Sequence, residues 1–133
     1  AAFLVWTPTK YAEMLAEKMR VHGAKAWLVN TGWTGGAYGK GNRISLPHTR
    51  AIIDAIHAGT LSDVPTANDA YFGVAVPESV PGVPTEILNP INTWADKDAF
   101  HATAKKLVGL FQTNFAQYES FASADIMAAA PKV

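Results

Sequence analysis

The chain has 133 residues, 49% of them hydrophobic and 17% charged, which suits one hydrophobic core and excludes a disordered chain. Its 11 basic and 11 acidic residues balance, so we expect no nucleic acid and no membrane among its partners. There is no cysteine, which excludes disulfides, thiol nucleophiles and cysteine metal sites and fits a cytoplasmic protein.

The first third of the chain alternates between strand and helix patterns. Residues 1–6 form a short apolar run that ends at Thr7-Pro8 and predict a buried strand. A helix is expected from Pro8, with Thr7 as its N-cap and Gly23 at its end. Its apolar face, expected to pack on the core, contains Tyr11, Ala12, Leu15, Ala16 and Met19. Residues 26–29 predict a second buried strand, and this order of elements favours an α/β fold.

A glycine-rich stretch follows, from Asn30 to Arg50, and contains five of the ten glycines. Glycine lets a backbone approach a ligand closely, and a helix beginning at Pro47 would present free N–H groups, so the stretch could form a nucleotide or phosphate site. The alternative is a simple turn. The P-loop pattern fails because Lys40 is followed by Gly41 rather than by serine or threonine. The loop aromatics, Trp33 and Tyr38, could stack on a base or hold the loop to the core.

The helix from Pro47 to Ala58 is expected to bury three isoleucines, which are Ile52, Ile53 and Ile56. Arg43–Leu46 before it predicts a short strand or an edge segment. Arg50 lies in the first turn, where the helix dipole disfavours a cation. It therefore either meets a carboxylate or phosphate or is a solvated side chain.

The second half of the chain begins with a polar loop and ends in helices. We expect, in order, a loop over residues 60–70, a strand over 71–76, a proline-rich extended segment over 78–94 with a turn at 85–88, a long helix over 96–118 and a weak helix over 122–130. The four histidines form no H-x-x-x-H pair, so we expect no metal site made from this chain alone.

Beyond these patterns, the chain carries a series of longer motifs in a fixed order. They are YAEMLAEKM from Tyr11, WLVNTGW from Trp27, GNRI from Gly41, TRAIIDAI from Thr49, FG from Phe72, PGVP from Pro81, ILNP from Ile87 and NTW from Asn92. In this series the chain resembles the C-terminal part of ATP-dependent phosphoenolpyruvate carboxykinase. The resemblance covers nearly the whole length.

The resemblance implies a carboxy-lyase of gluconeogenesis that converts oxaloacetate and ATP to phosphoenolpyruvate, ADP and CO2 with Mg2+ and Mn2+. Residues 1–133 would be the C-terminal part of its mixed-sheet mononucleotide-binding domain, with packed helices, incomplete on its own. The P-loop, the metal ligands and the oxaloacetate-binding residues would lie upstream, in the remainder of the same protein. This chain would then hold no catalytic residue and would be inactive alone. The alternative is a self-standing, non-catalytic nucleotide-binding or interaction module.

The resemblance also implies three ATP-binding residues, by match to the motif G-x-R-I-x-x-x-x-T-R. Arg43 would lie against the nucleotide, Ile44 would supply an apolar surface and backbone contacts, and Thr49 would help to read the adenine edge. Without the resemblance, Arg43 could be a surface residue and Ile44 a core residue.

Overall fold

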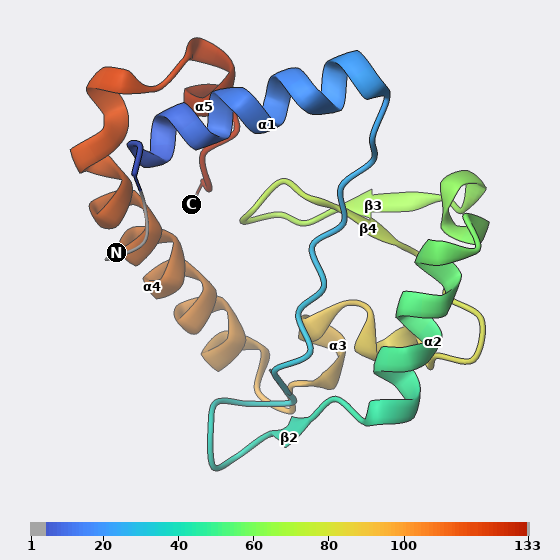
Figure 1. Cartoon of the computed structure of the whole chain (residues 1–133). Helices are drawn as coiled ribbons and strands as arrows, with labels where there is room; N and C mark the ends of the chain where they lie inside the picture. The colour runs from blue at the N-terminus through green and yellow to red at the C-terminus, as the bar shows by residue number, and fades with distance from the viewer. Residues whose placement is uncertain (1–4, 133) are drawn as a thin grey trace.

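The computed structural model describes residues 5–132 as a set of helices arranged around a long extended segment (Figure 1). The helices are α1 Pro8–His22, α2 Leu46–His57, α3 Pro90–Thr93, α4 Lys97–Phe115 and α5 Ala124–Ala128. Short 3-10 helices are η1 Thr60–Asp63, η2 Thr85–Ile87 and η3 Ala116–Phe121. The strands are β1 Trp33–Thr34, β2 Asn42–Arg43, β3 Thr66–Asn68 and β4 Ala75–Pro77. The strand expected over residues 1–6 lies largely outside the described residues, and Val5 and Trp6 are not in a strand.

The helices begin where the sequence predicts because capping side chains satisfy their first N–H groups. Thr7 Oγ1 accepts from Lys10 N at 3.4 Å, with Pro8 at the first position of α1. Gly23 ends α1 in the left-handed conformation, at φ 60°. Asp96 Oδ1 accepts from Ala99 N at 2.9 Å at the start of α4. The helices expected from Pro8, Pro47 and Asp96 are therefore confirmed to within a few residues.

The strands form two separate antiparallel pairs, β1 with β2 and β3 with β4. In the second pair Thr66 lies opposite Pro77 and Asn68 opposite Ala75. The strand expected over residues 71–76 is only partly right, because residues 71–73 belong to the turn that precedes β4. Asp69 Oδ1 closes this turn by accepting from Tyr71 N at 2.9 Å and Phe72 N at 2.7 Å. β3 lies in a region expected to be a loop, since its residues show no apolar alternation.

The buried strand expected at residues 26–29 is wrong. The segment is extended, but it pairs with none of the strands in residues 5–132, and Leu28 is 90% exposed. The prediction fails because a continuous apolar run shows a strand's preference but does not supply the neighbouring strand that must bond its N–H and C=O groups. Only Trp27 of this segment packs against the core. The structure thus shows a mixture of helices and small antiparallel sheets.

The core lies between α2, η1 and the proline-rich segment that follows β4. Its buried residues are Ala55, Leu61, Val80 and Val83. Ile52 and Ile56 of α2 pack against them, as the helical pattern predicts. A separate cluster of aromatic side chains packs α4 against the turn before β4 and against Trp94. Its ring pairs are Phe72–Phe111, Tyr71–Phe100 and Trp94–Phe100, with centroids 5.7 to 6.4 Å apart.

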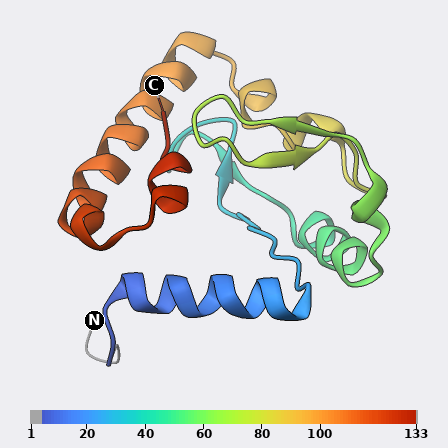
Figure 2. The ribbon, with the colours of Figure 1, turned by 90° about the horizontal axis from the view of Figure 1, so that it is seen from above.

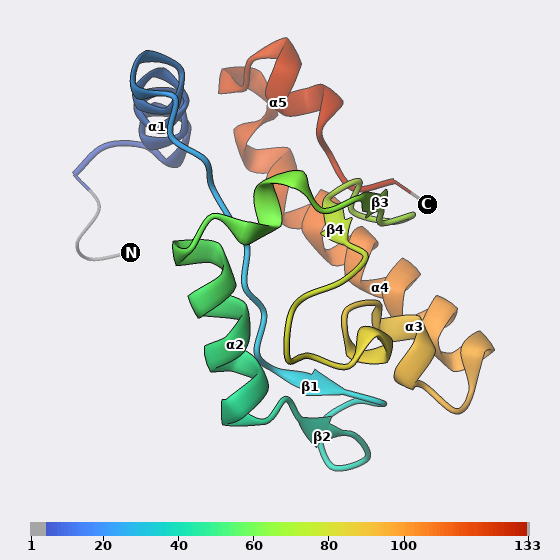
Figure 3. The ribbon, with the colours of Figure 1, turned by 90° about the vertical axis from the view of Figure 1, so that its right-hand side faces the viewer.

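Helix α1 approaches η3 but lies away from the core around α2 in two perpendicular views (Figure 2, Figure 3). The expectation that its apolar face packs on a core is wrong within the described chain, because α1 has no buried residue and Leu15 is 61% exposed. The whole chain exposes 9829 Å². A compact monomer of its 14.2 kDa would expose roughly 6,800 Å². Apolar surface therefore remains uncovered on an open arrangement of helices.

A helix must be both long and strongly apolar to span a bilayer. None of the helices within residues 5–132 meets both conditions.

Candidate functional site

The glycine-rich stretch folds as a tight antiparallel hairpin in which Trp33 lies opposite Arg43 and Thr34 opposite Asn42. Lys40 N and Gly41 N both donate to the Ala37 carbonyl at 3.0 Å, which closes the connection between the strands. Gly36 is buried at φ 153°, in a region that disfavours other residues. The glycines therefore serve the turn itself, whichever ligand the hairpin meets.

Gly41 shows how closely the two arms of the hairpin approach. A Cβ atom at this position would lie 2.4 Å from the Thr34 carbonyl oxygen and 2.6 Å from the Gly36 carbonyl oxygen. Both are backbone atoms, so no side-chain rotation could relieve the contact. Only glycine fits here without a shift of the hairpin.

The two loop aromatics pack on each other. Trp33 and Tyr38 meet edge to face with ring centroids 5.1 Å apart. Tyr38 is 84% exposed, so it does not hold the loop to the core of the described chain. The pair instead stiffens the outer face of the hairpin.

An open cavity of about 410 Å³ lies where the extended segment, the hairpin and the start of α2 converge. Its lining residues are Val29, Asn30, Thr31, Gly32, Arg43, Ile44, Leu46 and Thr49. Arg43, Ile44 and Thr49, the residues singled out from the sequence, thus line one cavity. The volume falls within the range of small-molecule sites, roughly 300 to 1,000 Å³.

Each of the three residues is held by a different element. Arg43 ends β2 and is exposed. Ile44 is half-buried, and its N–H donates to the Gly32 carbonyl at 3.1 Å, which joins the hairpin to the extended segment. Thr49 is half-buried in the first turn of α2, where its N–H donates to the Ser45 carbonyl at 3.0 Å. Backbone bonds on both sides of the cavity therefore fix its shape.

The start of α2 offers few free N–H groups to an anion. Pro47 has none, and the N–H groups of His48 and Thr49 donate to the Ser45 side chain and carbonyl. In the first turn this leaves the N–H of Leu46. The phosphate site considered from the sequence at this helix start is therefore poorly supplied with donors.

The charge at the cavity comes from Arg43. Within residues 5–132 the single salt bridge joins Lys10 and Glu13, so no carboxylate of the described chain neutralises this guanidinium. Arg50 has no acidic partner in the same range either. An unpaired arginine beside an apolar residue and a hydroxyl suits a planar, partly polar ligand such as a nucleotide base with its sugar and nearest phosphate.

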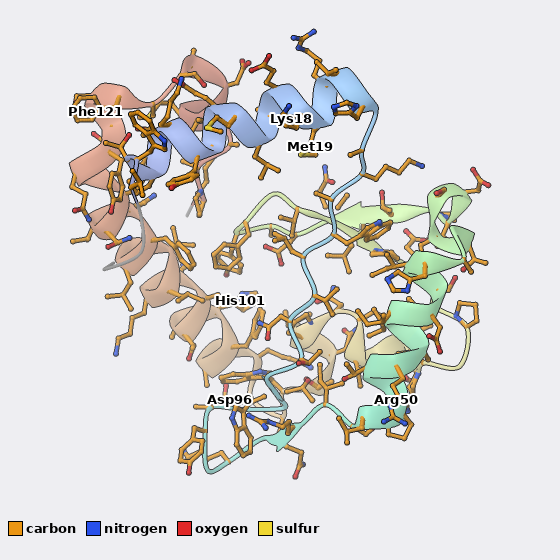
Figure 4. All side chains as sticks on the ribbon, in the orientation of Figure 1. Lys18, Met19, Arg50, Asp96, His101 and Phe121 are labelled. Atoms are coloured by element: carbon orange, nitrogen blue, oxygen red, sulfur yellow. The ribbon has the colours of Figure 1, made fainter. Side chains whose placement is uncertain are left out.

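No group of three or more histidine or acidic side chains that could hold a metal ion occurs in residues 5–132. The described residues therefore do not fit the Mg2+ or Mn2+ that the resemblance implies. Among residues 5–132, the histidine whose side chain makes a hydrogen bond is His101, which projects from α4 toward the turn before β4 (Figure 4). Its Nδ1 lies 2.6 Å from Tyr71 Oη, which accounts for it as a structural residue.

Five of the eight lining residues are not among the three ATP-binding residues expected from the motif, although all of them except Val29 lie within the glycine-rich stretch considered as a site. Asn30 to Gly32 line the cavity together with Val29, and the Asn30 side-chain oxygen accepts from Gly32 N at 3.0 Å. A signal existed, since this part of the WLVNTGW motif directly precedes the hairpin. The apolar run before these residues instead predicts the end of a strand, so the pattern does not indicate that they line the cavity.

The hairpin, the extended segment and the helix start together define a candidate nucleotide-binding segment. A family model described as phosphoenolpyruvate carboxykinase, the ATP-dependent form, matches residues 1–86. That match spans more than half of the chain, and the chain belongs to the ATP-dependent phosphoenolpyruvate carboxykinase family.

Individual relatives agree with the family model. The chain is similar to the phosphoenolpyruvate carboxykinase (ATP) of Dictyostelium discoideum, 57% identical over 129 residues, which are 97% of this chain and 23% of the relative. It is similar to the phosphoenolpyruvate carboxykinase (ATP) 2 of Salinibacter ruber, 56% identical over 133 residues, 100% of this chain and 25% of the relative. The enzyme of Flavobacterium johnsoniae is 53% identical over 131 residues, 98% of this chain and 24% of the relative. The chain thus spans about a quarter of the length of the relatives that it matches.

Proposed function

We propose that this chain is a segment of a carboxykinase that converts oxaloacetate and ATP to phosphoenolpyruvate, ADP and CO2, and that it supplies the adenine-side contacts to ATP. The observation that carries the proposal is the placement of Arg43, Ile44 and Thr49 around one cavity in a chain of this family. Relatives named for ATP-dependent carboxykinase activity support the reaction.

Each side chain brings one kind of interaction to this role. The Arg43 guanidinium is planar and permanently charged, so it can stack on a base and attract the phosphates. Ile44 offers half-buried apolar surface to the face of the base. The Thr49 hydroxyl both donates and accepts, which suits the mixed hydrogen-bonding edge of adenine. Specificity for adenine would then come from this chain, while the triphosphate would be held elsewhere.

The remaining machinery is proposed to lie in the rest of the same protein. This includes the P-loop, the ligands of Mg2+ and Mn2+, the oxaloacetate-binding residues and the remaining strands of a mixed-sheet mononucleotide-binding domain. When bound, the metal ions would offset charge on the transferring phosphoryl group. As part of the same proposal, the intact protein would be cytoplasmic and would act in gluconeogenesis.

The alternative, a self-standing nucleotide-binding or interaction module, is less well supported. Such a module should cover its own apolar faces, yet Leu15 and Leu28 are 61% and 90% exposed. The chain also exposes more surface than a compact monomer of its mass would, which likewise disfavours a self-standing module. Both observations favour a segment that packs against further parts of its own protein.

The proposal predicts a sharp difference between the intact protein and its segment. We expect the intact protein to form phosphoenolpyruvate from oxaloacetate and ATP, and the isolated 133-residue chain to form none, because the P-loop, the metal ligands and the oxaloacetate-binding residues are proposed to lie in the remainder of the protein. A coupled assay for phosphoenolpyruvate on both samples measures this. Metal-dependent turnover by the purified short chain would overturn the proposal that the catalytic residues lie in the rest of the protein.

A further inference from the structure

The hydroxyl of Thr93, in the short helix α3, lies against the inner arm of the glycine-rich hairpin, 58 residues away in sequence from Gly35. Gly35 N donates to Thr93 Oγ1 at 2.9 Å, and Thr34 Oγ1 lies 2.7 Å from the same atom. Thr93 Oγ1 in turn donates to the Pro90 carbonyl at 2.9 Å. All three contacts converge on one oxygen atom.

The hydrogen count of a hydroxyl decides the direction of each bond. Thr93 has a single hydroxyl hydrogen, and this hydrogen goes to the Pro90 carbonyl. The Thr93 oxygen must therefore accept from both Gly35 N and Thr34 Oγ1, so Thr34 is the donor of the 2.7 Å bond. One donated and two accepted bonds use the full capacity of the group, and among residue types of similar size only serine could replace it.

The contact leaves little clearance between the hairpin and α3. A Cβ atom on Gly35 would lie 3.2 Å from the Thr93 carbonyl oxygen. Thr34, Gly35 and Thr93 are all half-buried, which limits competition from water for these bonds. The hairpin is thus joined to α3 by hydrogen bonds to the Thr93 hydroxyl.

This contact of Thr93 with Thr34 and Gly35, called the seat below, lies one residue pair away from the candidate nucleotide residue Arg43. Thr34 pairs with Asn42, and the neighbouring pair is Trp33 with Arg43. Holding Thr34 and Gly35 therefore fixes the strand that carries Arg43, although Thr93 itself does not line the cavity.

We propose that Thr93 is a positioning residue for ATP, which acts by seating the hairpin so that the Arg43 side chain faces the nucleotide. The inference rests on the function proposed for this chain. It assigns to α3 a role in nucleotide affinity that depends on a hydroxyl group and not on side-chain volume.

The test uses Thr93→Val and Thr93→Ser in the intact protein, with dissociation constants for MgATP and for oxaloacetate measured by calorimetry. Thr93→Val keeps the shape but leaves Gly35 N and Thr34 Oγ1 without an acceptor, and should weaken MgATP roughly 5- to 50-fold. Thr93→Ser keeps the hydroxyl and should stay within about threefold of the parent protein. Oxaloacetate binding should change little in either variant.

Thr103→Val is the matched control, because the Thr103 hydroxyl donates to the Ala99 carbonyl of its own helix at 2.8 Å.

The role through Arg43 is tested by combining variants. In an Arg43→Ala background, Thr93→Val should have little further effect on MgATP affinity, since the side chain that it positions is gone. Fully additive losses, or equal losses of ATP and oxaloacetate, would overturn the inference. If Thr93→Val does not yield folded protein, Thr34→Val removes one of the three bonds and should weaken MgATP in the same direction; no effect would count against the seat.

The two proposals can fail separately. If Arg43→Ala weakens MgATP while Thr93→Val does not, the seat is wrong and the ATP site stands. If neither variant affects MgATP, the ATP site itself is wrong.

Discussion

Replacing Arg43 with alanine in the intact protein is expected to weaken ATP far more than oxaloacetate. Hydrogen bonds to a charged group contribute about 1.5 to 3 kcal/mol, so ATP affinity should fall roughly 10- to 150-fold. Oxaloacetate should be affected little because its binding residues are proposed to lie in the remainder of the protein. Dissociation constants for the two substrates, measured separately, give the comparison directly.

Two further variants refine the result for Arg43. Arg43→Lys keeps the charge but loses the planar group that can stack, so ATP affinity should be intermediate. Arg20→Ala removes an exposed arginine from the last turn of α1, outside the cavity, and controls for loss of charge alone. If Arg43→Ala weakens both substrates equally, Arg43 acts on the structure and not on the nucleotide.

The second large effect is expected for Gly41→Ala. The added Cβ would lie 2.4 and 2.6 Å from two backbone carbonyl oxygens, so the hairpin must open to accept it. Forcing one extra carbon atom into so tight a place typically costs about 1 to 3 kcal/mol of stability. We expect a lower urea midpoint for the unfolding of this region and a loss of ATP affinity, because β2 carries Arg43.

Gly109→Ala provides the matched control for this substitution. Gly109 lies within α4, and a Cβ atom there would meet nothing within 4 Å. The same chemical change should therefore stabilise α4 by up to about 1 kcal/mol, since alanine is the better helix former. A Gly41→Ala protein as stable as the parent would show that the hairpin is not as close-packed as described.

The helices could be predicted well because their signals are local. Thr7 with Pro8, Gly23 and Asp96 each act on N–H or C=O groups within four residues, and the structure places all of them at helix ends. The isoleucines Ile52 and Ile56 of α2 also pack on the core, because their spacing follows the period of the helix.

The strands and the burial of α1 could not be predicted in the same way. An apolar run such as residues 26–29 becomes a strand only when another strand lies beside it, and sequence pattern says nothing about that partner. The apolar face of α1 likewise indicates that the helix should be covered, but not by which element. Both failures concern contacts between distant parts of a chain.

In the candidate site, too, the residues grouped by a local motif could be predicted, whereas those brought together by folding could not. Arg43, Ile44 and Thr49 lie within seven positions of one another, so a single sequence motif is enough to group them. Thr93 could not be found in this way, because only the folded chain brings α3 to the hairpin. Asn30 to Gly32 lie in the glycine-rich stretch considered as a site, but the motif that singles out Arg43, Ile44 and Thr49 does not include them.

The central claim is that this chain contacts the adenine side of ATP. The most direct measurement is photolabelling of the intact protein with 8-azido-ATP, followed by peptide mapping, with and without an excess of ATP. Label that ATP displaces should map to residues 29–49, which contain the lining of the cavity. ATP-displaceable label found only outside residues 29–49 would contradict the proposed site.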